Sequence, residues 1–236
     1  APYGPIKVQE FVNEYLSDAN TVVATSLALY DLLQAHSQPV YHVQNGFDPT
    51  IFSPNCKMLK GPIQIAWCGN AADPVKGVDN ILKPSALGYS LRLATGNVPQ
   101  NNLAEFYRQS DVYVVCSVHE AEPLTLIEAM ACGCFPVCCQ VGIVPELVRH
   151  KENGYIVSER SVEAFAEAFS WCAENRTLLG RGVLVRKPIS MLGNRLSRML
   201  FSLFSAMMML RQIRTWQVLK YSVIYFILMA SRRFML

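Results

Sequence analysis

The feature that most constrains this chain is a series of short apolar segments that alternate with helical segments between residues 61 and 175. Near-continuous apolar segments are typical of strands buried on both faces of a sheet. Their alternation with helices predicts an α/β fold, a Rossmann-like parallel sheet with helices on both faces. The strands are expected at Ile63–Cys68, Ser90–Ala94, Val112–Cys116, Pro136–Cys139 and Tyr155–Val157.

Helices are expected between these strands, and Gly133 follows one of them at a position typical of a helix stop. The predicted helices are Val78–Leu82, Asn102–Arg108, Leu124–Ala131, Pro145–Val148 and Val162–Cys172. Sheets of this kind bind ligands at the carboxyl ends of their strands. The chemistry is therefore expected in the loops after Cys68, Ala94, Cys116 and Cys139.

Residues 1–60 are expected to form part of a second domain and a linker. Two helical and two strand segments precede the turn dipeptide Asn45-Gly46. They are Lys7–Leu16, Thr21–Ala24, Ser26–Ala35 and Val40–Val43. The stretch Asp48–Pro62 contains three prolines and no periodicity, which predicts a linker.

Charge divides the chain near residue 175. All 18 acidic residues lie at or before Glu174, whereas residues 176–236 contain eleven basic residues and no acidic one. The net negative charge of residues 1–175 argues against a nucleic-acid-binding protein. The hydrophobic fraction of 51% argues against overall disorder.

The basic, Met-rich tail, residues 176–236, has two interpretations. Its charge-free apolar stretches are shorter than the roughly 18 residues of a membrane span, so it could be a membrane-surface segment that gives peripheral membrane contact. Alternatively, it is the product of an altered reading frame, which the abrupt loss of acidic residues favours. In that case limited proteolysis is expected to cut first between Asn175 and Pro188.

The eight cysteines are predicted to be buried free thiols. Their spacing lacks the paired C-x2-C pattern of a zinc site, and several lie inside apolar strands. No metal site and no cofactor is therefore expected. This use of cysteine, with no signal peptide at the start of the sequence, predicts a cytoplasmic protein.

The loop after Cys116 carries the strongest chemical signal. Pro123 at the start of the next helix leaves the amides of Leu124 and Thr125 available to an anion such as phosphate. Glu120 precedes that helix and Glu128 lies within it, and carboxylates accept hydrogen bonds from vicinal hydroxyls. The loop could therefore hold a nucleotide-sugar. Alternatively, the acidic residues only favour the positive end of the helix.

A glycosidase-type carboxylate pair is less favoured. The carboxyl groups of such a pair lie roughly 5–9.5 Å apart, whereas Glu120 and Glu128 are separated by a loop and two helical turns and are expected to be farther apart.

The loop after Cys68 adds Gly69, which permits a close backbone approach, and Lys76, which could contact a diphosphate or be an ordinary solvated lysine. The sequence has no G-x-G-x-x-G after a strand and no Walker A lysine, so dinucleotide oxidoreductases and NTPases lose their main support.

The residues Glu120-x7-Glu128, in the context Glu120-Ala-Glu-Pro-Leu-Thr-Leu-Ile-Glu-Ala-Met-Ala-Cys-Gly, resemble the signature of retaining GT-B glycosyltransferases of family 4. The resemblance covers about residues 20–175, including Asn45-Gly46-Phe47-Asp48, the Lys76-Gly77 loop and Asn153-Gly154. It implies that residues 61–175 bind a nucleotide-sugar donor, and that residues 1–60 are the end of the amino-terminal GT-B domain.

The resemblance implies a role for each site residue. Glu128 would hold the ribose hydroxyls, and Glu120, the expected catalytic residue, the hydroxyls of the transferred sugar. Lys76, the amides of Leu124 and Thr125, and the loop at Gly69 and Asn70 would neutralise the diphosphate without a metal ion.

Two residues depart from the family pattern, because family members often have arginine where Asn70 stands and glycine where Ala121 stands. The acceptor, a glycan, a lipid or a small molecule, is not identified. Because only part of an amino-terminal domain is recognisable, a sugar-nucleotide binding fragment without turnover stays an alternative.

Overall fold

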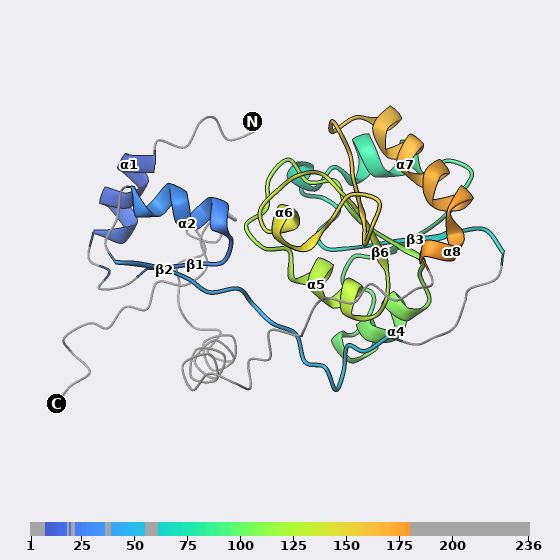
Figure 1. Ribbon diagram of the computed structural model, residues 1–236, viewed down its shortest axis with the longest axis horizontal. Helices are drawn as coiled ribbons and strands as arrows, with labels where there is room; N and C mark the ends of the chain where they lie inside the picture. Colours follow the sequence, from blue (N-terminus) through green and yellow to red (C-terminus); the bar gives the residue numbers. More distant parts are fainter. Residues whose placement is uncertain (1–7, 18, 20–21, 36–38, 55–60, 180–236) are drawn as a thin grey trace.

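The computed structural model describes residues 8–17, 19, 22–35, 39–54 and 61–179. They form a small unit before residue 43 and a large domain from residue 61, connected by an extended segment (Figure 1). The tail was predicted over residues 176–236, and its part from residue 180 onward lies outside the described residues. The membrane-contact and reading-frame interpretations of the tail fall on that part.

The large domain contains the predicted parallel sheet. Its strands are β3 (Gln64–Cys68), β4 (Ser90–Ala94), β5 (Val112–Val115), β6 (Phe135–Cys138) and β7 (Tyr155–Ile156). They lie in the order β4-β3-β5-β6-β7, and every neighbouring pair is parallel. Each strand lies within one or two residues of its predicted position, and the α/β prediction is confirmed.

Helices cover both faces of this sheet. They are α3 (Lys83–Ser85), α4 (Leu103–Arg108), α5 (Leu124–Ala131), α6 (Val144–Leu147), α7 (Val162–Glu174) and α8 (Arg176–Leu179). Helices α4 and α5 lie on one face and α7 on the other (Figure 1). The predicted helix Val78–Leu82 is a π-helical turn that continues into α3. Gly133 follows α5 with a φ of +94°, as a helix stop requires.

The small unit is a two-stranded parallel sheet with short helices. Its elements are α1 (Val8–Phe11), a π-helical turn (Val12–Leu16), β1 (Val22–Ala24), α2 (Leu27–Gln34) and β2 (Val40–His42). The Ser26 hydroxyl caps α2 by accepting a hydrogen bond from the Leu29 amide. One continuous helix was expected over Lys7–Leu16, and the described part is an α-helical turn followed by a π-helical turn.

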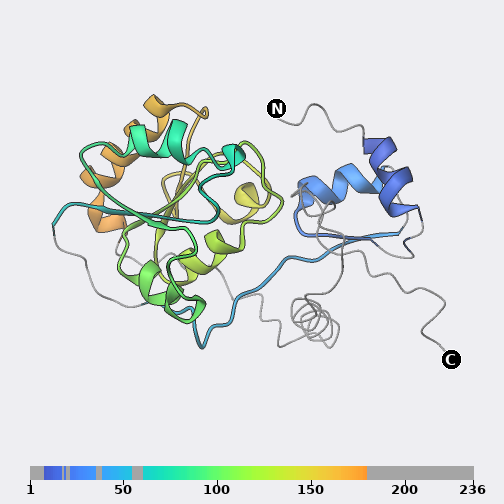
Figure 2. The ribbon, with the colours of Figure 1, turned by 180° about the vertical axis from the view of Figure 1, so that it is seen from behind.

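The segment after β2 runs from the small unit to the large domain, as Figure 2 shows from behind. Its described residues up to Pro54 contain no helix or strand, and the linker predicted from the sequence covers Asp48–Pro62. It is nevertheless docked, because the Arg108 side chain of α4 donates to the carbonyls of Ser53 (2.9 Å) and Ile51 (2.7 Å). Phe52 is buried against Tyr107.

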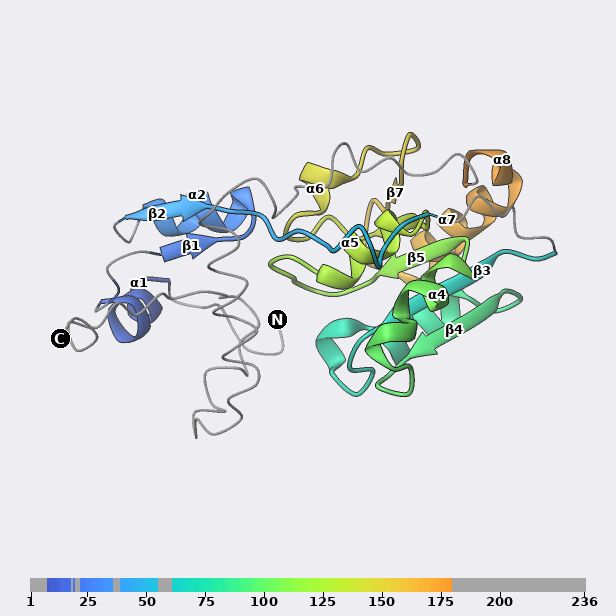
Figure 3. The same cartoon turned by 90° about the horizontal axis from the view of Figure 1, so that it is seen from below.

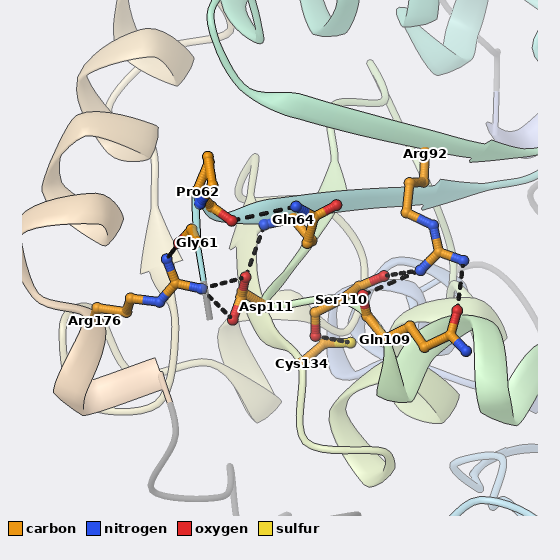
Figure 4. A network of polar contacts seen from close by, with 9 residues as sticks. All are labelled: Gly61, Pro62, Gln64, Arg92, Gln109, Ser110, Asp111, Cys134 and Arg176. Carbon is orange, nitrogen blue, oxygen red and sulfur yellow. Dashed lines mark hydrogen bonds and ion pairs between the residues drawn. The ribbon is translucent and has the colours of Figure 1, made fainter. Parts of the chain in front are cut away.

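The amino ends of the strands are fixed by a network around Asp111, shown in Figure 4. The Asp111 carboxylate accepts hydrogen bonds from the Gln64 amide at 2.7 Å and from Arg176 at 3.2 Å. Arg176 lies one residue beyond the boundary expected at 175, and Leu179 is buried in the same core. The packing of the large domain therefore continues to the end of α8.

Candidate functional site

The loop after β3 begins with two of the predicted site residues. Gly69 has a φ of +151°, and its amide donates to the carbonyl of Ala94 at the end of β4. The Asn70 side chain accepts a hydrogen bond from the Ala72 amide at 3.2 Å, so it closes a turn within the loop. The structure thus places both residues at the carboxyl edge of the sheet, where ligands bind in folds of this kind.

The same loop ends at Lys76 and Gly77, against the end of β5. The Asp73 carboxylate caps the short 3-10 turn Pro74–Lys76 through the Val75 amide, at 3.0 Å. Gly77 has a φ of +72°, and a Cβ there would lie 2.7 Å from the carbonyl oxygen of Cys116 and would overlap a guanidinium nitrogen of Arg160. Only glycine therefore allows this loop to pack on the loop that follows β5.

The structure brings Lys76 and Glu120 together. The Lys76 Nζ lies 2.6 Å from Glu120 Oε1, and the Ser117 hydroxyl donates to the same oxygen at 2.7 Å. The side chains of the ion pair are 24% and 11% exposed, so they are partly shielded from water but open to one side. Partial burial strengthens such a contact relative to one at the surface.

The amino terminus of α5 lies in the same loop. Pro123 is the N-cap residue, and it supplies no side chain to cap the helix. The amides at Leu124 and Thr125 therefore point out of the helix at its positive end. Leu124 is itself exposed. An anion in front of α5 would meet these amides.

Glu128 lies inside α5 and has a different partner. Its carboxylate accepts a hydrogen bond from the hydroxyl of Tyr107 on α4, at 3.1 Å. Burial raises the pKa of the Glu128 carboxyl, and the Tyr107 hydroxyl lowers it in part. This carboxylate is held in place by a neutral donor and has further acceptor capacity for hydroxyl groups.

Lys76, Glu120 and the amino terminus of α5 thus form one constellation at the carboxyl edge of the sheet, and α5 also carries Glu128. It combines one cation, the positive end of α5 and two carboxylates with separate partners. An anion such as a diphosphate fits the cation and helix end, and carboxylates on either side accept hydrogen bonds from sugar hydroxyls.

Sequence reasoning missed three residues that support this constellation. Ser117 and Tyr107 hold the two glutamates by hydrogen bonds from their hydroxyl groups. Arg160, between β7 and α7, donates from Nε to the Cys116 carbonyl at 2.8 Å. Its Nη2 is buried and has no hydrogen-bond partner among the residues that the structure describes. No local pattern marks Arg160, because its contacts are more than forty residues away in sequence.

Other candidate sites lie elsewhere or are not formed. The seven cysteines in the described ranges are free thiols, six of them buried. Within those ranges no group of three or more His, Cys, Asp or Glu side chains is arranged to hold a metal ion. A shallow cavity of about 450 Å³ between β7 and α7, lined by Gln140, His150 and Glu167 among others, contains none of the predicted site residues.

Comparison with known families is consistent with this geometry. Residues 93–181 match the family model described as Glycosyl transferases group 1. This part of the chain is a group 1 glycosyltransferase domain. The matched range contains Glu120, α5 and Glu128, and with them the retaining GT-B signature expected from the sequence.

Characterised relatives are similar over part of their length. N-acetyl-alpha-D-glucosaminyl L-malate synthase of Bacillus anthracis is 40% identical over 57 residues, which are 24% of this chain and 15% of that protein. D-inositol 3-phosphate glycosyltransferase of Geodermatophilus obscurus is 39% identical over 80 residues, 34% of this chain and 18% of that protein. The chain thus spans less than a third of the curated relatives that it matches.

The fold has counterparts among solved structures. HepE of Anabaena, in complex with UDP-glucose, superposes with a TM-score of 0.65 at 15% identity, over 87% of this chain and 70% of that one. At this identity the match supports only the fold, a GT-B fold that includes the large domain and the small unit.

Within the part of the chain that the structure describes, no helix is both long enough and apolar enough to cross a bilayer.

Proposed function

We propose that this glycosyltransferase domain binds a nucleoside diphosphate sugar and transfers its sugar with retention of anomeric configuration. The observation that carries the proposal is the Lys76–Glu120 pair at 2.6 Å, placed beside the open amino terminus of α5. A cation and a helix terminus suit a diphosphate, while a carboxylate beside them suits the hydroxyls of the attached sugar. HepE, which shares the fold, was solved with UDP-glucose.

In this proposal the diphosphate is the leaving group. Transfer breaks the bond between the anomeric carbon and the β-phosphate oxygen and forms a bond from the same carbon to an acceptor hydroxyl oxygen, whose proton passes to the departing phosphate. Negative charge grows on that phosphate as its bond to the sugar breaks. Lys76 and the amides of Leu124 and Thr125 stabilise that charge, a role that a metal ion performs in other enzymes. Metal independence is part of the proposal.

The two glutamates have separate roles in this proposal. Glu128, held by the Tyr107 hydroxyl, binds the ribose hydroxyls, and Glu120 binds hydroxyls of the transferred sugar. In the absence of ligand, Glu120 is neutralised by Lys76. A bound diphosphate competes for Lys76 and releases acceptor capacity on Glu120. Binding of the leaving group and binding of the sugar are thereby linked through one ion pair.

Binding without turnover is the second candidate function. The observation that favours it is the size of the small unit, whose described part offers two strands and short helices as the acceptor side. The two candidates share the donor site, so nucleotide binding alone does not separate them.

The test is a binding panel followed by a turnover assay. Calorimetry with UDP, ADP and GDP, with and without EDTA, measures whether the chain binds a nucleoside diphosphate and whether a metal ion contributes. Release of free nucleotide from the matching nucleotide-sugar then measures turnover. Binding of no nucleoside diphosphate would contradict the proposal, and binding without release would favour the second candidate.

A further inference from the structure

Two carboxylates of the large domain have partners in the small unit or in the segment that leaves it, and no role in the proposed donor chemistry. The Glu122 carboxylate accepts hydrogen bonds from the Asn45 backbone amide at 2.8 and 3.0 Å, and from the Asn45 side-chain amide at 2.5 Å. The Glu146 carboxylate accepts from the Leu27 amide at 2.8 Å and from the Gln44 side chain at 2.7 Å. We call Glu122 and Glu146 the junction pair.

The partners of the junction pair belong to the first turn of α2 and to the segment that leaves β2. Leu27 is the first residue of α2, so Glu146 lies at the positive end of that helix. The imidazole of His42 faces Glu146 as well, with Nε2 3.6 Å from the carboxylate. The junction pair therefore holds the small unit at two points.

Glu122 belongs to the same loop as the donor-site residue Glu120, and the residue between them points into the small unit. Ala121 is buried in the apolar cluster of the small unit, with Leu29 and Leu33. Three consecutive residues thus contact Lys76, the core of the small unit and Asn45. In Figure 3 this loop, before α5, extends toward the small unit.

The loop has little freedom to move independently of these contacts. The Ala121 carbonyl accepts from the Ile143 amide at 3.1 Å. Gly142 has a φ of +50°, and a Cβ there would collide with the carbonyls of Ala121 and Glu120. The loop after β6 therefore supports the loop before α5 from one side, while Asn45 and the small unit fix it from the other.

We propose that Glu122 is a positioning residue: by binding Asn45 it fixes the orientation of Glu120 and of the α5 amides, so that the position of the small unit sets the affinity of the donor site. The inference rests on the proposed function. It assigns to the small unit a role in donor binding, besides any contact with an acceptor. A displacement of about 1 Å in a catalytic constellation is enough to reduce turnover by two orders of magnitude.

The experiment compares the unaltered chain with Glu122→Ala, Glu122→Gln and Asn45→Ala, and with Glu152→Ala as a matched control at an exposed glutamate. Hydrogen exchange at the Asn45 amide reports the junction directly, and calorimetry reports UDP affinity. We expect Glu122→Ala to speed exchange at Asn45 and to weaken UDP binding roughly tenfold, since the hydrogen bonds that fix Asn45 against the loop before α5 are lost. The Glu152→Ala control should change neither.

Two further comparisons separate positioning from general damage. Glu122→Gln keeps an oxygen that accepts from the Asn45 amide, so it should recover most of the UDP affinity. Asn45→Ala removes only the side-chain donor and keeps the backbone amide, so it should cause a smaller loss than Glu122→Ala, and the double variant should lose no more than Glu122→Ala alone.

The outcomes decide between the inference and the function on which it rests. Faster exchange at Asn45 with unchanged UDP affinity would overturn the positioning role and leave the junction pair as a structural contact. Additive losses in the double variant would overturn it too. If the unaltered chain binds no nucleoside diphosphate, the proposed function fails and the positioning role fails with it, while the exchange data still show whether the junction forms.

Discussion

The large domain and the small unit follow the same alternation of strands and helices, but their strands are enclosed differently. In the large domain β3, β5 and β6 each pair on both edges. Its core contains several fully buried aromatic side chains, including Phe135, Phe165 and Phe169. In the small unit, β1 and β2 pair only with each other within the described residues. A two-stranded sheet is marginal without further packing.

The difference explains where the candidate site lies. Every predicted site residue belongs to a loop or helix that the five-stranded sheet supports. The small unit instead receives support, because Ala121 completes its apolar cluster and the junction pair holds its edge. The large domain therefore carries the candidate site, and the small unit depends on the large domain for part of its stability. Stability measurements on the two regions can test this difference.

The largest expected effect comes from the two cores. Phe165→Ala removes a fully buried ring from the large domain and should cost about 3–5 kcal/mol of unfolding free energy. Leu33→Ala in α2 should cost about 2–4 kcal/mol, but only for local opening of the small unit. Hydrogen exchange of β5 and β1 measures the two effects separately. If Leu33→Ala lowered the protection of β5 as much as that of β1, the two regions would be one cooperative unit.

The next effect concerns the cation of the site. Lys76→Ala should weaken nucleoside diphosphate binding by about 2–3 kcal/mol, because it removes a charged donor and leaves the Glu120 carboxylate facing the phosphate. Lys83→Ala is the control, since the Lys83–Asp79 pair is exposed and such pairs contribute little. Calorimetry with the diphosphate measures both variants. If the Lys76→Ala and Lys83→Ala variants bound the diphosphate with equal affinity, Lys76 would not be part of the binding site.

The two glutamates should respond differently to substitution. Glu128→Ala should weaken nucleoside diphosphate binding by roughly 1–3 kcal/mol, since the ribose loses a hydrogen-bond acceptor. Glu120→Gln should leave nucleoside diphosphate binding intact, because it frees Lys76 from its carboxylate partner, and should lower the affinity for the sugar-bearing donor. Calorimetry with the two ligands separates these roles. Equal losses for both ligands in Glu120→Gln would show that Glu120 is a structural support.

Features that depend on residues close together in the sequence were predicted, whereas features that depend on contacts between distant residues were not. Helix α5 was predicted with its observed bounds, because Pro123 and Gly133 mark its two ends locally. The Lys76–Glu120 proximity was also expected, since both loops leave the same edge of a parallel sheet. The roles of Glu122 and Arg160 were not predicted, because each depends on a contact made between distant parts of the chain.

Helical segments at the two π-helical turns were predicted in place but not in type. Val12–Leu16 and Val78–Leu82 have the apolar spacing of a helix, and that spacing does not distinguish one wide turn from regular α-helix. Asn70 illustrates the same limit for function. Its place in the loop was predicted, whereas the turn that its side chain closes depends on the folded backbone.

The smallest expected effect is a pH dependence of the junction between the two regions. Burial raises the pKa of the Glu122 carboxyl from 4.5 to about 7, with a further contribution from the Glu146 charge. Hydrogen bonds from Asn45 and Thr25 lower it in part. Because the junction binds a proton more tightly than the opened state does, its extra stability is complete below about pH 4.5 and is lost as the pH rises through about 7.

Between pH 6 and 8 the loss should be about 1.4 kcal/mol, or roughly tenfold in the protection factor of the Asn45 amide. The protection factor is the measured exchange rate relative to the rate of an unstructured amide, so the intrinsic effect of pH is removed. Glutamine does not titrate, and Glu122→Gln leaves the contact between His42 and Glu146 in place. Protection in Glu122→Gln should therefore vary less over this range than in the unaltered chain. The same slope in both proteins would show that Glu122 is not the source of the pH dependence, whereas a protection factor that rises with pH would show that the ionised Glu122 carboxylate is the form that holds Asn45.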